Sequence, residues 1–389
     1  MESNNSTPNI VIEEKTGYVP PKKPTFKEKM KNSWQEKKEK WHDGLESAKE
    51  EFKAFGNGFV LLFKDPRKGF KNLWTFIKSQ KGWLFILPAL ILMAIFTFYP
   101  IVNSVILAFK QHYNALTNTY DGIGFSNFKD ILTNNTSGAA TADFGTCLVN
   151  TLLIALISVP ASTLLALLIS VWLNNIKVLQ KAYQTIFFLP YLTNALAMGA
   201  VFATFFNVIG SGRRIDSYGL VNDIIRMFGG NAINWINPSQ FGQAFNPWLG
   251  RFVVIIYSIW SGLPFKILIL FSALQSVNKQ YYDAAKIDGA SKNTTLWKIT
   301  VPLISPMISY LIVTGFIGGL KAYSSIVGIF GTSMGPADKY EMGTMVGYIY
   351  QCIGGNSMGY AAAGSLILFA IILVFTIINN QLSKRRVHY

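Results

Sequence analysis

The feature that most constrains this sequence is a set of long apolar stretches that carry almost no charge. A helix of about 20 apolar residues is long enough to cross the hydrocarbon core of a bilayer. Six stretches reach that length, at residues 82–109, 147–173, 182–210, 252–274, 302–330 and 359–382. We therefore predict an all-α polytopic membrane protein with six core transmembrane helices.

Composition separates this membrane domain from a polar leader. The chain has 389 residues, of which 50% are hydrophobic and 14% are charged, whereas soluble domains carry about 25% charged residues. The charges are concentrated before the first apolar stretch. We predict a disordered tail over residues 1–25, an amphipathic helical leader over 26–81, and a transmembrane domain over 82–389.

The leader has a helical repeat with a lysine-rich polar face. Trp34, Trp41, Ala48 and Phe55 recur every seven residues. A helix of this kind binds the surface of a membrane, because anionic lipid attracts its lysines. We expect the leader to lie on membrane lipid at the cytoplasmic face. The alternative is that it packs against an ATPase or against the chain's own helices.

Lysine and arginine in alternate short loops predict the orientation of the spans. Lys177 and Lys181 lie between the second and third stretches, several lysines lie in 275–300, and basic residues 384–386 follow the last stretch. Basic loops face the cytoplasm. We therefore expect both termini to be cytoplasmic and the protein to be a multi-pass component of the cell membrane.

The cytoplasmic loop 275–300 has more local structure than a simple connection needs. Its first part reads as a short helix that ends at Gly289, where a glycine readily takes a positive φ. Ser291 then has the character of an N-cap for a second short helix. The small pair Ala284 and Ala285 would let another protein approach the backbone closely, which is typical of a docking helix.

The stretch "DAAKIDGASKNTTLWKITVP", 283–302, resembles the signature loop of the inner-membrane subunits of binding-protein-dependent ABC importers. It departs from that pattern at Asp283, where glutamate is usual, and at Val301, where leucine is usual. The resemblance implies a coupling helix that inserts into an ATPase subunit. The alternative is a helical hairpin that only turns the chain. The residues expected to couple to the ATPase are Asp283, Ala284, Ala285, Gly289, Ile299 and Pro302.

The resemblance extends over about residues 83–385 and favours the sugar-permease branch of that family. Residues 219–238, 260–265 and 334–351 are similar to the corresponding segments of its larger, maltose-type partners. This implies a permease subunit that translocates a sugar or oligosaccharide. The partners it implies are a homologous second permease subunit, two ATP-binding subunits and an extracytoplasmic solute-binding protein.

Several kinds of site are missing from the sequence. It has no GxxxxGK[ST] motif for ATP, no Cys/His spacing for a metal and no carboxylate inside a predicted span. We expect a channel-forming subunit that is not an enzyme, with ATP hydrolysed by separate subunits, and no cofactor, metal or nucleic-acid partner. The alternatives are an importer permease for another neutral solute, or a self-sufficient secondary transporter, which would usually keep an intramembrane acid.

The two cysteines, Cys147 and Cys352, are both expected near the outer face, where a disulfide between them could form. Their spacing does not decide whether they pair.

Aromatic and small polar residues inside the spans are the candidates for the solute pathway. Aromatic rings cover the apolar faces of a sugar, and polar groups bind its hydroxyls. For each aromatic residue the alternative is ordinary packing, and for the glycines it is close helix contact. The resemblance supports the candidates from the fourth and fifth spans. The pathway candidates are Tyr191, Asn194, Tyr257, Trp260, Ser261, Gly318, Gly319, Tyr323 and Ser324.

Lys266 and Lys321 are the only charged residues inside the predicted spans. We expect both to extend toward the nearer membrane interface, with a solute contact as the alternative for Lys321. The scarcity of charge in the spans favours a neutral solute.

Overall fold

The computed structural model describes Gln35, Glu46 and residues 81–135, 141–176, 178–211, 214–238, 244–336 and 341–386. The chain divides into two compact units, Met1–Thr97 and Phe98–Tyr389. The predicted tail and almost all of the predicted leader lie outside the described residues.

In the described part of the chain, four helical stretches are long and apolar enough to cross a membrane. Two of them begin with side-chain caps: Asp143 accepts a hydrogen bond from the backbone N–H of Thr146 at 2.7 Å, and Asn246 accepts one from Trp248 at 3.0 Å. Such caps satisfy backbone donors that the helix itself leaves unpaired. The stretches are Ile86–Phe109, built from α3 (Lys81–Met93), the π-helical η1 (Ala94–Phe98) and α4 (Tyr99–Phe109), and three single helices, α6 (Phe144–Asn175), α10 (Pro247–Ser276) and α17 (Met358–Arg386).

Two bent pairs of helices are also apolar and long enough when each pair is taken together, so the described residues hold four to six candidate spans. The first pair bends by 100° and the second by 69°. Prolines near both breaks remove backbone donors and so weaken a continuous helix. The first pair joins α7 (Gln180–Phe188) and the 3₁₀ turn η2 (Leu189–Leu192) to α8 (Ala195–Phe206), and the second joins α12 (Lys292–Thr295), the π-helical η3 (Leu296–Thr300) and α13 (Val301–Leu303) to α14 (Ser305–Gly319).

The predicted fifth span, 302–330, is not one helix. α14 ends at Gly319, and α15 (Ser324–Phe330) begins after a short non-helical connection. Gly318 and Gly319, at the end of α14, stabilise a helix less than the leucine and alanine of α6 do, and Lys321 after them interrupts the apolar pattern.

The protein is mostly helical, but the all-α prediction missed two short antiparallel hairpins. Both lie in loops between the long helices, where the hydrophobic pattern is too short to identify a strand. The hairpins pair β1 (Lys110–Gln111) with β2 (Gly122–Ile123), and β3 (Val208–Ser211) with β4 (Arg214–Tyr218). The remaining helices are α5 (Ser126–Leu132), α9 (Leu220–Met227), α11 (Lys279–Ile287) and α16 (Met345–Gly354).

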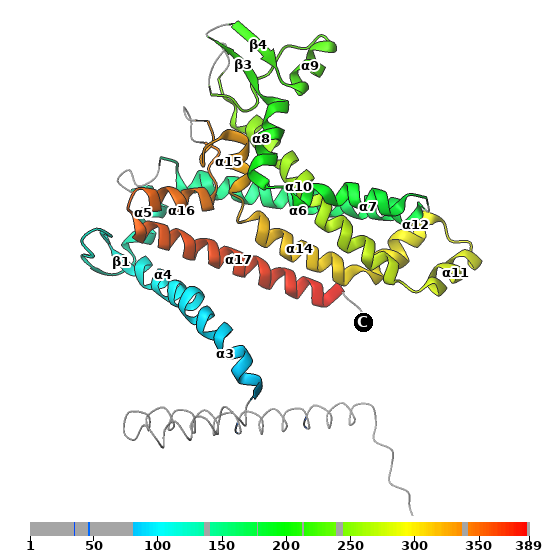
Figure 1. Cartoon of the computed structure of the whole chain (residues 1–389), viewed down its shortest axis with the longest axis horizontal. Helices are drawn as coiled ribbons and strands as arrows, with labels where there is room; N and C mark the ends of the chain where they lie inside the picture. The colour runs from blue at the N-terminus through cyan, green and yellow to red at the C-terminus, as the bar shows by residue number, and fades with distance from the viewer. Residues whose placement is uncertain are drawn as a thin grey trace, which may run out of the picture. The chain divides into compact units, whose positions relative to one another are not determined.

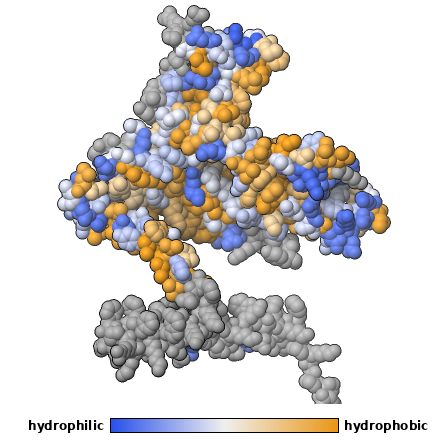
Figure 2. All heavy atoms as spheres, viewed as in Figure 1, coloured by the Kyte–Doolittle hydropathy of each residue, from blue (hydrophilic) through white to orange (hydrophobic). Residues whose placement is uncertain are grey.

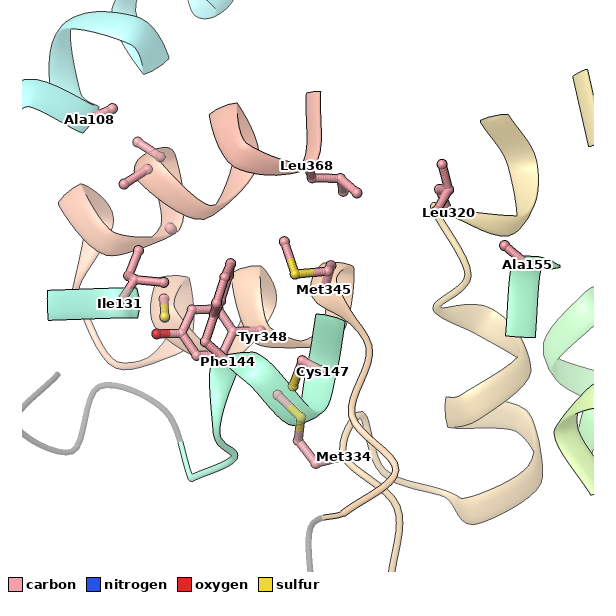
Figure 3. Packing of buried hydrophobic residues seen from close by; sticks show 14 of the residues in the cluster. Ala108, Ile131, Phe144, Cys147, Ala155, Leu320, Met334, Met345, Tyr348 and Leu368 are labelled. Atoms are coloured by element: carbon pink, nitrogen blue, oxygen red, sulfur yellow. The ribbon is translucent and has the colours of Figure 1, made fainter. Parts of the chain in front are cut away.

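Within the second unit, α6 and α10 pack along each other, α14 packs against both, and α17 packs against α14 (Figure 1). One hydrophobic cluster joins the start of α6 to α16 and α17, with the ring of Phe144 5.2 Å from that of Tyr348 (Figure 3). A second cluster joins the ends of α6 and α10 to α14. The space between α6, α10 and α14 is therefore framed by packed helices.

Cys147 and Cys352 are both fully buried in the first of these clusters, and both are free thiols. The sequence left a disulfide open, and the structure does not contain one. Burial raises the pKa of Cys352 to about 11, so this thiol stays protonated at neutral pH and is a poor nucleophile.

α8 and α15 approach each other unusually closely at two glycines. A Cβ atom at Gly199 would lie 2.8 Å from Cα of Gly328, and a Cβ at Gly328 would lie 3.0 Å from Cα of Gly199. Small residues allow this kind of backbone contact between helices in a membrane. The contact holds α15 beside α8 directly after the break in the fifth predicted span.

The surface of the second unit divides by polarity. Apolar side chains cover much of the helical body, while hydrophilic side chains gather around α11, at the right of the view (Figure 2). This distribution is the one expected if the helical body faces lipid and the loop that contains α11 faces water.

Candidate functional site

A cavity of about 330 Å³ lies between α6, α10 and α14. This volume is at the small end of the range for ligand pockets, roughly 300–1,000 Å³. Its wall combines hydroxyl groups, small residues and the aromatic rings of Tyr257 and Tyr323. The residues that form it are Ile154, Ser158, Val159 and Ser162 of α6, Ala195 of α8, Tyr257, Ser258, Ser261, Gly262 and Lys266 of α10, Gly315, Gly318 and Gly319 of α14, Lys321, Ala322 and Tyr323 of the connection, and Ser324 and Ser325 of α15.

The break between α14 and α15 places irregular backbone on this wall. Polar backbone groups at membrane depth are tolerated where they line a cavity or are buried in protein. The carbonyl of Ala322 accepts a hydrogen bond from the hydroxyl of Thr344 at 2.6 Å, and the ring of Tyr323 stacks on Tyr350 at 4.6 Å. α16 therefore holds the connection in place.

Six of the nine pathway candidates lie together in the wall of this cavity: Tyr257, Ser261, Gly318, Gly319, Tyr323 and Ser324. The two glycines differ. A Cβ at Gly319 would lie 3.2 Å from that of Ala155, whereas a Cβ at Gly318 would meet nothing within 4 Å. Gly319 thus permits close packing of α14 on α6, and Gly318 faces open space.

The other three candidates lie outside this wall. Trp260 packs beside Phe202 and Tyr257, with ring centroids 6.2 and 6.3 Å away. Tyr191 is half exposed and stacks on Phe265 at 5.7 Å. Asn194 caps α8 by accepting a hydrogen bond from the N–H of Leu196 at 2.8 Å, so its side chain has a local structural task.

Tyr257 connects the cavity wall to α8. Its hydroxyl donates a 2.8 Å hydrogen bond to the carbonyl of Ala195. We predict that Tyr257→Phe lowers the free energy of unfolding by about 0.5–1.5 kcal/mol, because the carbonyl loses its donor. Denaturation of the purified protein in detergent measures this, with Tyr310→Phe, at an exposed tyrosine of α14, as the control. Equal stability of the two variants would contradict the prediction.

Lys266 is the residue of this wall that sequence reasoning placed wrongly. It does not extend to an interface: its side chain is buried, with 6% of the residue exposed. Its ammonium group donates to the carbonyl of Val159 and to the hydroxyls of Ser162 and Thr163, at 3.1, 2.6 and 3.0 Å. Sequence reasoning could not identify Ser162 and Thr163 of α6 as partners of this lysine of α10, because it does not show that the two helices pack together.

The loop between α10 and α14 has the local structure predicted for it. α11 is a helix of nine residues, and Gly289 has a φ of +70°. The N–H of Ala290 donates to the carbonyl of Ala285 at 2.9 Å, and that of Gly289 to Lys286 at 3.1 Å. This pair of bonds is the Schellman ending of a helix. Ser291 caps α12 by accepting from the N–H of Thr294 at 3.2 Å.

α11 has three distinct faces. Ala285 is buried and the hydroxyl of Tyr282 accepts a 3.3 Å hydrogen bond from Thr300, which attaches α11 to η3. Asp283 and Lys286 form an exposed ion pair at 3.2 Å. A third face carries Tyr281, Ala284 and Ile287, all exposed, with Ile287 at 86%. We call these last three residues the apolar stripe.

Ile299 and Pro302, the last two coupling candidates, lie on the helix that leads from this loop to α14. Ile299 is half-buried in η3, and Pro302 is exposed in α13. They are not part of α11 itself.

The helices, the central cavity and the polar loop define a polytopic transport protein with no ligand cluster for a metal among the described residues. The family described as "Binding-protein-dependent transport system inner membrane component" matches residues 148–388. The chain belongs to this family. It is the permease subunit of an ABC importer, a multi-pass protein of the bacterial inner membrane, and the ATPase is a separate subunit.

Individual relatives agree with this assignment. The chain is 29% identical to the arabinooligosaccharides transport system permease protein AraP of Halalkalibacterium halodurans, over 79% of this chain and 89% of the relative. It is 27% identical to the multiple sugar-binding transport system permease protein MsmF of Streptococcus mutans, over 78% and 95%. The structure resembles that of a bacterial alginate ABC transporter in complex with a periplasmic protein bound to alginate pentasaccharide, with a TM-score of 0.63, 25% identity, and coverage of 80% and 97%. The family predicted from the loop sequence is confirmed.

Proposed function

We propose that this chain forms half of the translocation pathway of a sugar or oligosaccharide importer. It would span the membrane six times with both termini in the cytoplasm, each bent helix pair counting as one span. It would pair with a homologous permease and two ATP-binding subunits, and would receive its solute from an extracytoplasmic binding protein. The solutes named for AraP, MsmF and the alginate transporter support a sugar.

The observation that carries this proposal is the position of α11 in the chain. α10 and α14 both contribute to the cavity wall, and α11 lies between them in sequence. A subunit that binds the apolar stripe can therefore move two walls of the cavity. A movement of this kind would switch the cavity between outward and inward access.

In this proposal the cavity of about 330 Å³ is the solute pathway. Tyr257 and Tyr323 would cover the apolar faces of a sugar ring, and Ser261 and Ser324 would bind its hydroxyls. Tyr191, Asn194 and Trp260 would belong to the pathway only in another conformation of the transporter. The leader 26–81 would lie on cytoplasmic membrane lipid.

Binding of the ATPase through the apolar stripe predicts the effect of a charge at Ile287. We expect Ile287→Asp to reduce ATPase co-purification and ATP-driven sugar uptake at least tenfold, because a desolvated unpaired charge would lie in the interface. The chain is expressed with its neighbouring transporter genes, purified through a tag on the permease, and tested for uptake of labelled neutral and acidic oligosaccharides in proteoliposomes.

Lys279→Gln is the matched control, because it changes the net charge by the same amount at an exposed residue of α11 outside the apolar stripe. It should keep at least half of the wild-type uptake. If Ile287→Asp retains the ATPase as well as Lys279→Gln does, the stripe is not the docking surface. If the wild-type chain alone transports sugar without ATP, the importer proposal fails and a secondary transporter is favoured.

A further inference from the structure

The buried ammonium group of Lys266 has hydrogen-bond partners but no counter-charge. Its three acceptors are a carbonyl and two hydroxyls, all neutral. Among the residues that the structure describes, no aspartate or glutamate forms an ion pair with it. A buried charge without an opposite charge destabilises a protein even when it is hydrogen-bonded, and inside a membrane such a residue usually belongs to a solute or ion pathway.

The cavity as a whole is positive. Its lining contains Lys266 and Lys321 and no aspartate or glutamate. Lys321 lies on the connection between α14 and α15, and its side chain is exposed. In a space of about 330 Å³ enclosed mainly by apolar and hydroxyl groups, two ammonium groups attract an anion more strongly than they would in water.

The ammonium group of Lys266 lies close to Gly315 of α14. A Cβ at Gly315 would lie 3.5 Å from Nζ and 2.8 Å from Cγ1 of Val159, so the absence of a side chain at this position permits close packing. Gly315 and Lys266 both belong to the cavity lining, so the charge of Lys266 lies close to the solute space.

We propose that the cavity selects an anionic sugar, and that the positive charges of Lys266 and Lys321 attract its carboxylate or phosphate. Because the three N–H groups of Lys266 are already donated to protein acceptors, this lysine acts through its charge. This inference rests on the proposed function and narrows its solute. The hydroxyls of Ser162 and Thr163 hold the ammonium group in position, and the anion supplies the missing counter-charge. The scarcity of charge in the spans suggested a neutral solute, but the two lysines of those spans meet in one cavity.

Direct binding to the purified transporter, without a solute-binding protein, tests the proposal. The probes are digalacturonate, its dimethyl ester, which has the same sugar frame without charge, and glucose 6-phosphate against glucose. We expect each anion to bind about tenfold or more tightly than its neutral counterpart, because the anion supplies the counter-charge that the two lysines lack. Preference for only one of the two anions identifies a carboxylate or a phosphate as the recognised group.

Lys266→Gln keeps a hydrogen-bond donor but removes the charge, and should bring the ratio of acid to ester affinities close to one. Lys321→Gln should lower this ratio about threefold, and it provides the test if Lys266→Gln does not fold. Lys129→Gln removes the charge of an exposed lysine on α5 and should leave the ratio unchanged. Equal binding of both anions and their neutral counterparts by the wild-type protein would overturn the proposal. An ATP-dependent importer that shows this equality would still support the proposed function.

Discussion

Gly289→Val is expected to reduce ATP-driven uptake at least tenfold while leaving the transmembrane helices folded. Gly289 has a φ of +70°, and a Cβ at this position would meet nothing within 4 Å. The penalty is therefore conformational. An ordinary L-residue in the left-handed region costs about 1–2 kcal/mol, and a β-branched residue costs more. This is enough to unwind the Schellman ending of α11 and misplace the apolar stripe.

Gly289→Asn is the control, because asparagine tolerates the left-handed conformation better than other side chains. It should keep most of the uptake, and both variants should elute as monodisperse protein in detergent. The measurement is uptake of labelled sugar by reconstituted transporter, with ATPase co-purification measured in parallel. Equal uptake by the valine and asparagine variants would show that the turn at Gly289 has no part in coupling.

Gly199→Leu is expected to have the largest effect on folding. Its Cβ would lie 2.8 Å from Cα of Gly328, which is backbone and cannot move aside as the end of a side chain could. Overpacking a tight contact costs about 1–3 kcal/mol for a small group and more for a large one. We expect Gly199→Leu to prevent purification of a monodisperse protein, and Gly199→Ala to lower the free energy of unfolding by about 1–3 kcal/mol.

Gly354→Ala is the matched control for the alanine substitution. Gly354 ends α16, and a Cβ there would meet nothing within 4 Å. Since alanine has the higher helix propensity, this variant should be neutral or more stable by up to about 1 kcal/mol. The free energies of unfolding come from denaturation in detergent micelles. A Gly199→Ala variant as stable as Gly354→Ala would mean that α8 and α15 can separate without loss.

The long spans and the local structure of the loop could be predicted because both depend on neighbouring residues. Apolar length identified α6, α10 and α17, and the glycine and serine after α11 predicted its ending and the next cap. The breaks in the third and fifth spans were missed because hydropathy averages over a proline or a glycine pair. The connection after α14 is held by Thr344 and Tyr350, which are too far away in the sequence for a local pattern to reveal.

The candidate site was only partly predictable for the same reason. Aromatic, hydroxyl and glycine residues of α10, of α14 and of the segment after α14 could be chosen by chemistry, and six of the nine candidates line one cavity. The position of Lys266 depends on Ser162 and Thr163, about a hundred residues away in the chain. When the packing of the helices is unknown, a lysine that is buried within a span cannot be distinguished from one that extends to the membrane interface.

The attachment of α11 at both of its ends has a mechanical consequence. α10 ends at Ser276, only two residues before α11 begins at Lys279, and the hydroxyl contact between Tyr282 and Thr300 fastens α11 to the segment that leads into α14. A displacement of α11 is therefore transmitted to α10 and α14 at the same time. The width of the cavity between these two helices would then depend on the orientation of one short helix, without relay through a chain of intervening side chains.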